Sequence, residues 1–132
     1  MTDAEAPDVV EHTSAVAFGP TLERLVAAIK GAGMTLFAQI DHAAGARDAG
    51  MTMPPTVVLI YGHPKGGTPL MLAAPLAALD LPLRVLVRED ADGRALVSFH
   101  PAAPILRRAG APEALATRLD PAQHLLVEAI RP

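Results

Sequence analysis

One glycine-rich run holds the residues best suited to binding a small ligand, His63-Pro64-Lys65-Gly66-Gly67-Thr68-Pro69. Threonine followed by proline is a common N-cap and first-turn pair of a helix. Free backbone N–H groups at a helix start favour an anion, and Lys65 adds a positive charge. The run is not a P-loop, because its lysine precedes the glycines. It predicts an anion cradle. The candidate ligand-binding residues are His63, Lys65, Gly66, Gly67 and Thr68.

A structural turn is the alternative interpretation of the same run. Gly66 and Gly67 would then adopt positive φ, Thr68 would cap the helix, and Lys65 would be solvated.

Asp41-His42 is a second candidate pair, since an aspartate can orient an imidazole for acid–base chemistry or metal binding. Its alternative role is to cap the turn that follows a strand. We retain Asp41 and His42 as ligand-binding candidates.

Metal and nucleophilic chemistry have little support in the sequence. Cysteine is absent, which excludes thiolate metal sites and thiol nucleophiles. His42, His63 and His100 stand near predicted strand ends without HxH or HxxxH spacing, so we expect no metal site. Neither serine lies in a G-x-S-x-G elbow. The sequence therefore predicts no cofactor and no catalytic residue.

Composition limits the class of protein. The 132 residues suffice for a single domain, with residues 1–8 as a loose N-terminal segment. A hydrophobic content of 51% argues against disorder, and a net charge of −3 argues against a nucleic-acid partner. No apolar run reaches the roughly 18 residues of a membrane span, and the acidic start does not resemble a signal peptide. We expect a cytoplasmic protein without a membrane partner.

Residue patterns predict an α+β fold in the order β-α-β-β-β-β-α. Leu22, Leu25, Val26 and Ile29 have the spacing of one helical face, and Gly31 and Gly33 can end that helix. The predicted strands are Asp8–Ala17, Met34–Ile40, Thr56–Tyr61 (buried on both faces), Pro82–Glu89 and Arg94–Phe99. Asp90-Ala91-Asp92-Gly93 predicts a hairpin between the last two strands. After His100 the chain is predicted to be helical, with Pro121 either kinking or dividing the helices. We expect two layers, a mainly antiparallel sheet with its helices on one face.

Alternation along the strands predicts a homodimer. If helices cover one sheet face, the opposite face still carries Leu86 and Leu96 together with Val58 and Ile60 of the apolar strand. A small monomer rarely leaves such a patch in water. A second copy related by a twofold axis is the simplest cover. These four residues are the dimer interface candidates.

Several short motifs then resemble the domain-of-unknown-function 302 family. They are Ile40-Asp41-His42, Gly62-His63-Pro64-Lys65, Gly67-Thr68-Pro69-Leu70-Met71 and Leu79-Asp80-Leu81-Pro82-Leu83-Arg84, in the family's order and spacing from about Leu22 to Arg108. The resemblance implies a TATA-binding-protein-like α+β fold, a bacterial or archaeal origin and a homodimer. It implies no activity.

The function predicted from the sequence is a homodimeric small-ligand (anion) binding or accessory protein without catalytic activity. One alternative is a small enzyme that uses Asp41, His42 and Lys65 as acid–base groups on an anionic substrate. Another is a structural module that binds a different protein through its sheet. Perturbed titration in a closed pocket would favour the enzyme, and an open apolar sheet face would favour the module.

Overall fold

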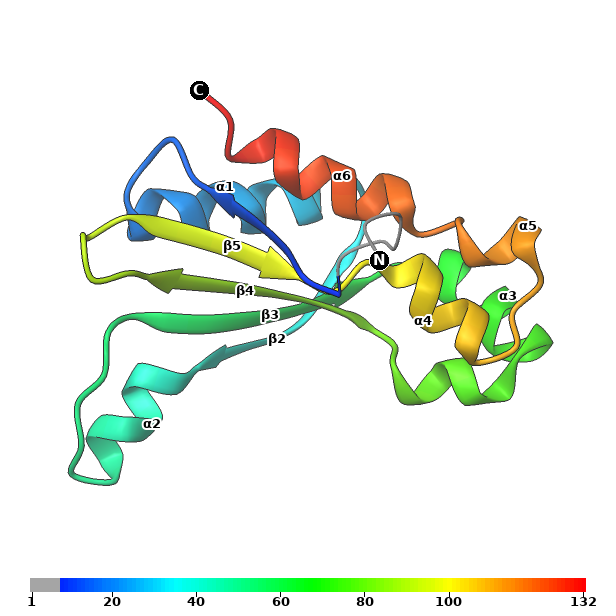
Figure 1. The fold of residues 1–132 in the computed structure, drawn as a ribbon, viewed down its shortest axis with the longest axis horizontal. Coiled ribbons are helices and arrows are strands. Elements are labelled where there is room, and N and C mark those ends of the chain that lie inside the picture. Colours follow the sequence, from blue (N-terminus) through cyan, green and yellow to red (C-terminus); the bar gives the residue numbers. More distant parts are fainter. Residues whose placement is uncertain (1–7) are drawn as a thin grey trace, which may run out of the picture.

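The computed structural model describes residues 8–132, which form one open sheet with helices (Figure 1). The predicted loose segment 1–8 lies outside the described residues except for Asp8. The elements are β1 (Val10–Thr13), α1 (Phe18–Gly31), β2 (Thr35–Asp41), α2 (His42–Asp48), β3 (Thr56–Gly62), α3 (Pro64–Ala73), the 3-10 helix η1 (Pro75–Leu79), β4 (Leu83–Glu89), β5 (Ala95–Phe99), α4 (Ala102–Arg108), α5 (Glu113–Ala116) and α6 (Asp120–Ala129). Among residues 8–132, no helix combines the length and the apolar character needed to cross a membrane.

The five strands lie in the order β1-β5-β4-β3-β2, and every neighbouring pair is antiparallel. This confirms the predicted α+β class and the β4–β5 hairpin. The hairpin turn has the conformation that its residues predict. Gly93 has φ +79°, and Asp90 accepts hydrogen bonds from the N–H groups of Asp92 and Arg94. β1 is shorter than the predicted strand Asp8–Ala17 and forms one edge of the sheet.

Two helices, α1 and α6, cover one face of the sheet. The buried face of α1 carries Leu25 and Ile29, two residues of the predicted apolar stripe, and α6 contributes Leu126. They pack over the side chains Val57, Leu59, Tyr61, Val85, Val87 and Val97. The prediction of helices on one face holds for these two helices. The segments α3, η1, α4 and α5 gather at one end of the sheet instead (Figure 1).

A bulge in β2 corrects the predicted face of that strand. Leu36 pairs with Tyr61, but Ala38 pairs with Ile60, so one extra residue, Phe37, is accommodated on β2. A bulge shifts the alternation of side chains by one residue. Leu36 therefore faces the helices, whereas Ala38 and Ile40 lie on the opposite face. Strict alternation along the predicted strand Met34–Ile40 would put all three side chains on one face, and that expectation is wrong.

Two further differences concern β3 and the C-terminal helices. Val57, Leu59 and Tyr61 are buried, while Val58 and Ile60 between them are half-buried, so β3 is not buried on both faces within one chain. The reason is that α1 and α6 cover one sheet face and leave the other open. Pro121 lies in the first turn of α6, which is separate from α5.

Candidate functional site

The strand register divides the sheet into two ends. At the turn end lie the β4–β5 turn, the C-terminus of β2 and α2; at the helix end lie α3, η1, α4 and α5 (Figure 1). Asp41 pairs with Val57 at the start of β3, whereas His63 follows the end of β3. Seven-residue strands put these ends about 20 Å apart. One chain therefore does not bring Asp41 and His42 together with Lys65, which removes the geometric basis for the acid–base enzyme.

Asp41 has the capping role that was its alternative interpretation. Its Oδ1 accepts a hydrogen bond of 2.9 Å from the N–H of Ala44 and caps α2. His42 is the first residue of that helix and is exposed. A carboxylate used in this way satisfies one free N–H of the helix start. The pair is thus explained by local structure.

The glycine-rich run forms a helix earlier than predicted. α3 begins at Pro64, so Gly66, Gly67 and Thr68 lie inside the helix, and Pro69 is an interior proline. Neither glycine has positive φ. The N-cap is His63, whose Nδ1 accepts a hydrogen bond of 3.2 Å from the N–H of Lys65. The predicted glycine loop and the predicted Thr68 cap are both wrong.

The start of α3 has no spare donor for an anion. Pro64 has no N–H, and the N–H of Lys65 is bound by His63 Nδ1. The N–H groups of Gly66 and Gly67 each donate to the His63 carbonyl at 2.9 Å. Lys65 and Thr68 are exposed. Because His63 satisfies these donors, the backbone geometry expected of an anion cradle is not formed.

Three residues of this run, His63, Pro64 and Gly67, instead border an apolar pocket of about 160 Å³ at the helix end. His63 and Gly67 lie on one face of α3 together with Met71, at i, i+4 and i+8. The pocket is lined by Met34, Phe37, Gly62, His63, Pro64, Gly67, Met71, Leu81, Pro82, Leu83, Leu119 and Ala122. Cavities of about 150 Å³ with apolar walls bind benzene-sized molecules. The pocket can therefore hold a ligand of that size.

His63 is the one residue in this pocket wall whose side chain can hydrogen bond. Because Nδ1 accepts from an N–H, its lone pair is used and the proton of the neutral ring lies on Nε2. Nε2 is then a donor rather than a metal ligand. Gly67 keeps the wall open, since a Cβ there would lie 3.9 Å from both Leu81 Cδ1 and Met71 Cε. A larger side chain at Gly67 would occupy the pocket.

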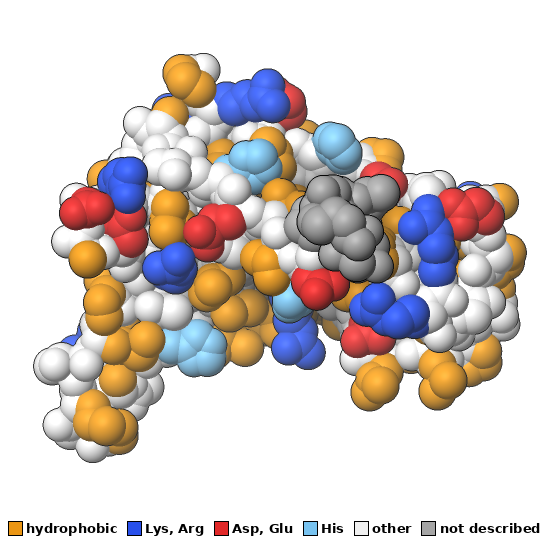
Figure 2. Space-filling view, viewed as in Figure 1, with side chains coloured by type: hydrophobic (Ala, Val, Ile, Leu, Met, Phe, Trp, Pro, Cys, Tyr) orange, Lys and Arg blue, Asp and Glu red, His pale blue; other side chains and the backbone are white. Residues whose placement is uncertain are grey.

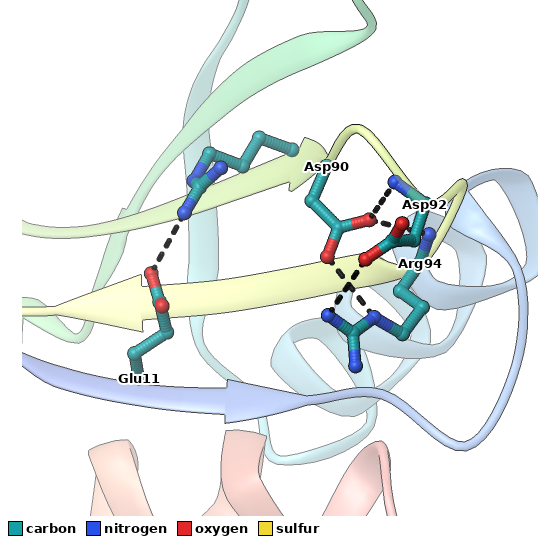
Figure 3. Close-up of polar contacts among 5 residues, drawn as sticks. Glu11, Asp90, Asp92 and Arg94 are labelled. Carbon is teal, nitrogen blue, oxygen red and sulfur yellow. Dashed lines mark hydrogen bonds and ion pairs between the residues drawn. The ribbon is translucent and has the colours of Figure 1, made fainter.

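Polar groups at the turn end satisfy one another (Figure 3). The Glu11 carboxylate accepts from the Ser98 hydroxyl at 2.7 Å and pairs with Arg88 at 3.3 Å. The Ser98 bond, and then Arg88, lower the pKa of Glu11. Backbone N–H bonds from Arg94 and Asp92, with the Arg94 side chain, likewise lower the pKa of Asp90. These contacts account for the charged side chains of the turn.

The candidate dimer residues lie on the open sheet face, with one difference from the prediction. Val58, Ile60 and Leu86 are half-buried on that face, but Leu96 is only 8% exposed within a single chain. β1 lies beside β5, and Leu96 is flanked on its face by Thr13 and Arg88. The sequence did not predict β1 as the neighbour of β5. Leu96 therefore belongs to the interior of the subunit.

The histidines do not converge on a metal site within the described chain. His42 lies at the turn end, whereas His63 and His100 follow β3 and β5 at the helix end. Residues 8–132 contain no group of three or more histidine, aspartate or glutamate side chains placed to hold a metal ion. The His100 Nδ1 lies 2.7 Å from the Asp8 carbonyl.

A family comparison agrees with this fold. The profile of the family described as "Domain of unknown function DUF302" matches residues 10–131. The chain belongs to this family. The match confirms the resemblance carried by the motifs and extends beyond their span in both directions.

The DUF302 fold is also seen in a solved structure, "Crystal structure of uncharacterized conserved protein DUF302 from Bacillus stearothermophilus". The TM-score is 0.81 at 17% identity, covering 95% of this DUF302 chain and 97% of that one. A likeness at this identity shows the fold alone. It supports the open sheet and its helices as the common architecture.

Two curated relatives are considerably longer than this DUF302 chain. "Fluoride-specific ion channel FluC 1" of Brucella suis biovar 1 (strain 1330) is 41% identical over 88 residues, which are 67% of this chain and 35% of that protein. The protein of the same name from Brucella abortus biovar 1 (strain 9-941) has the same identity over 33% of its length. The chain thus spans about a third of the curated relatives that it matches.

The pocket of the DUF302 chain was missed because its walls come from separate elements. Met34 follows α1, Phe37 is the bulge residue, and Leu119 precedes α6. A helix starting at Pro64 would have placed His63, Gly67 and Met71 on one face. Proline is favoured at the first helical position, so Pro64 was a usable signal.

Proposed function

We propose that this DUF302 chain is a non-catalytic accessory domain that binds a small ligand and works as a homodimer. The apolar pocket at the helix end carries the proposal. Its walls converge from β2, α3, the segment before β4 and the segment before α6, and it is the kind of concave, mainly apolar site that ligands use. The polar groups that acid–base catalysis would require lie at opposite ends of the sheet.

The pocket chemistry defines the ligand class. Carbon atoms of Met34, Phe37, Met71 and Leu119 suit an apolar body of benzene size. The His63 Nε2–H suits one hydrogen-bond acceptor on that body. The sequence predicted an anion at His63 and Lys65; the structure supports a ligand that is mainly apolar, with its acceptor towards His63.

The accessory role is supported by the curated relatives. The name "Fluoride-specific ion channel" belongs to whole proteins, about two thirds of which have no counterpart in this chain. We assign the channel activity of those proteins to that remaining part and propose that the shared third is an appended domain that responds to a ligand. The same domain can act here beside a separate partner.

The homodimer is supported by the open face of the sheet. Ile40 is 41% exposed and pairs with the half-buried Val58, which in turn pairs with the half-buried Leu86. Figure 2 shows hydrophobic side chains gathered on the α2 arm and beside its base, with histidine, basic and acidic side chains along the rest of that margin. A second copy would cover this face, as would another protein if the domain is an interaction module. Light scattering should report twice the chain mass of 13.7 kDa.

The ligand proposal is tested by titrating the full chain with ethylbenzene and acetophenone, followed by amide chemical shifts in NMR. Both should shift residues around Gly67 and Met71, and acetophenone should bind more tightly because its carbonyl accepts from His63. Gly67→Leu should abolish both effects by filling the pocket. Gly45→Leu in α2 is the matched control, because a Cβ at Gly45 meets nothing within 4 Å.

A second variant separates the polar contact from the apolar one. His63→Asn keeps an N-cap acceptor for the N–H of Lys65 but removes the Nε2–H. It should erase the preference for acetophenone while retaining ethylbenzene. Sodium fluoride should leave the pocket shifts unchanged, because carbon walls do not solvate a small anion. The proposal fails if neither aromatic probe moves these resonances, or if Gly67→Leu binds both as well as the wild type does.

A further inference from the structure

A second, more polar hollow lies beside the end of β5. One part, of about 230 Å³, is lined by Arg84, and an adjoining part, of about 450 Å³, is lined by Arg108. Both parts share Asp80, His100 and Ile105, so they adjoin one another, and we treat them together as one groove. We call Asp80, Arg84, His100, Ile105 and Arg108 the arginine groove. It runs between η1, the start of β4 and α4.

The two arginines of the groove are not engaged by acids of the described chain. Ion pairs within 4.0 Å are made by Arg88, Arg94, Arg107 and Arg131. Within residues 8–132, no carboxylate lies at that distance from Arg84 or Arg108. A guanidinium presents a planar fork of N–H donors that matches a carboxylate. The groove thus offers two guanidinium groups that no carboxylate of residues 8–132 occupies.

Hydrogen bonds fix both the backbone and the ring of His100 in the wall of the groove. Gln123 is 5% exposed; its Nε2 donates to the His100 carbonyl at 2.9 Å, and its Oε1 accepts from the Ala102 N–H at 3.0 Å. The His100 Nδ1 donates to the Asp8 carbonyl at 2.7 Å, since a carbonyl can only accept. The ring therefore keeps Nε2 uncommitted. Supporting bonds of this kind preorganise a binding wall.

The remaining surface of the groove combines an apolar floor with one acceptor. Leu81, Leu83, Ile105 and Leu106 supply the floor. The Asp80 carboxylate would repel an anionic ligand that has no hydrogen-bond donor. It would accept a hydrogen bond from a ligand that carries a hydroxyl or an ammonium group. The surface therefore favours an acid that also carries a donor.

We propose that the arginine groove binds a small organic acid bearing a hydroxyl or ammonium group. Its carboxylate bonds Arg84 and Arg108, its donor bonds Asp80, and its apolar body lies on Ile105 and Leu106. This site adjoins the apolar pocket, with which it shares Leu81 and Leu83, but none of its charged residues lines that pocket, and it does not depend on the function proposed there. It places anion binding at two arginines that were not among the ligand-binding candidates of the sequence.

The test is calorimetric titration of the full chain with L-leucine, its hydroxy-acid analogue, and isocaproate, which lacks the donor. Leucine or the hydroxy acid should bind about tenfold or more tightly than isocaproate, since one charge-assisted hydrogen bond is lost. The stronger of the two identifies the donor as ammonium or hydroxyl. Arg84→Gln and Arg108→Gln should each weaken binding about tenfold. Asp80→Asn should remove the preference over isocaproate.

Arg118→Gln is the matched control, because Arg118 is exposed, is unpaired within residues 8–132 and lies outside the groove. It should bind as the wild type does, and every variant should retain the wild-type melting temperature. The proposal is overturned if none of the acids binds at about 10 mM. It is equally overturned if Arg118→Gln weakens binding as much as the groove variants, or if inorganic phosphate binds as tightly as the acids do.

Discussion

The two ends of the sheet use polar residues in opposite ways. At the turn end, Asp41 caps α2 and Asp90 binds the backbone of its own turn, while Glu11, paired with Ser98 midway along the sheet, bonds Ser98 and Arg88. At the helix end, His63 borders a hollow, while Arg84 and Arg108 have no acid partner within residues 8–132. Polar and charged side chains therefore stabilise the fold at the turn end, whereas at the helix end they remain available to bind a ligand.

The physical origin of this difference is how many elements meet at each end. The β4–β5 turn is a tight reversal, so its polar groups find partners within a few residues. At the helix end, four helical segments and the start of β4 converge without filling all the space between them. Substitutions at the turn end should accordingly change stability, and those at the helix end should change binding.

The largest effect is expected from Leu96→Glu, near the turn end. It would place a charge at a site that is 8% exposed, so the free energy of unfolding should fall by about 3 kcal/mol or more. Chemical denaturation measures this. Ile40→Lys, at a site 41% exposed on the same open face, should instead keep stability within about 1 kcal/mol and split the dimer in light scattering. Wild-type stability in Leu96→Glu would contradict the burial of this side chain.

A smaller effect of opposite sign is expected from Tyr61→Phe, at the helix end. The Tyr61 hydroxyl is buried and has no hydrogen-bond partner within the described residues, and burial raises the pKa of the phenol. Removing an unsatisfied hydroxyl should leave the free energy of unfolding unchanged or raise it by about 1 kcal/mol. Thermal and urea unfolding of the two proteins should be compared. A clear loss of stability would show that this hydroxyl has a partner.

The smallest effect is expected in how the free energy of unfolding changes at acidic pH. The folded chain lowers the carboxyl pKa of Glu11 and Asp90 below their ordinary values of 4.5 and 3.8. Such groups stabilise the fold above those values, and the contribution is lost as the pH falls through the lowered pKa. Unfolding should therefore become easier below about pH 5, and less steeply so in a Glu11→Gln, Asp90→Asn double variant.

Glu113, which lies at the helix end, provides the comparison for this pH dependence of stability. Its hydrogen bonds to Arg107 lower its pKa too, but they join two exposed side chains. Exposed ion pairs contribute little, whereas Asp90 bonds two backbone N–H groups. Glu113→Gln should thus change the pH dependence less than the double variant does. An equal change would show that the two ends do not differ in this respect.

Local patterns predicted the elements better than they predicted the site. The stripe from Leu22 to Ile29 specified α1, and Gly93 with Asp90 specified the hairpin, because each depends on residues close in sequence. Thr68-Pro69 led to a wrong prediction because it too was interpreted locally, as a pair that resembles a helix start. His63 and Pro64 form a competing helix start five residues earlier, and His63 accepts hydrogen bonds from the free N–H groups of that start.

The sequence alone was enough for the family, the α+β class and the order of most elements. These follow from hydrogen bonding and hydrophobic periodicity along the chain. The tertiary structure alone decided that β1 lies beside β5, that Phe37 is a bulge, and that Arg84 and Arg108 border one groove. Strand pairing and converging loops depend on packing between residues far apart in sequence, and no local spacing encodes which of them meet.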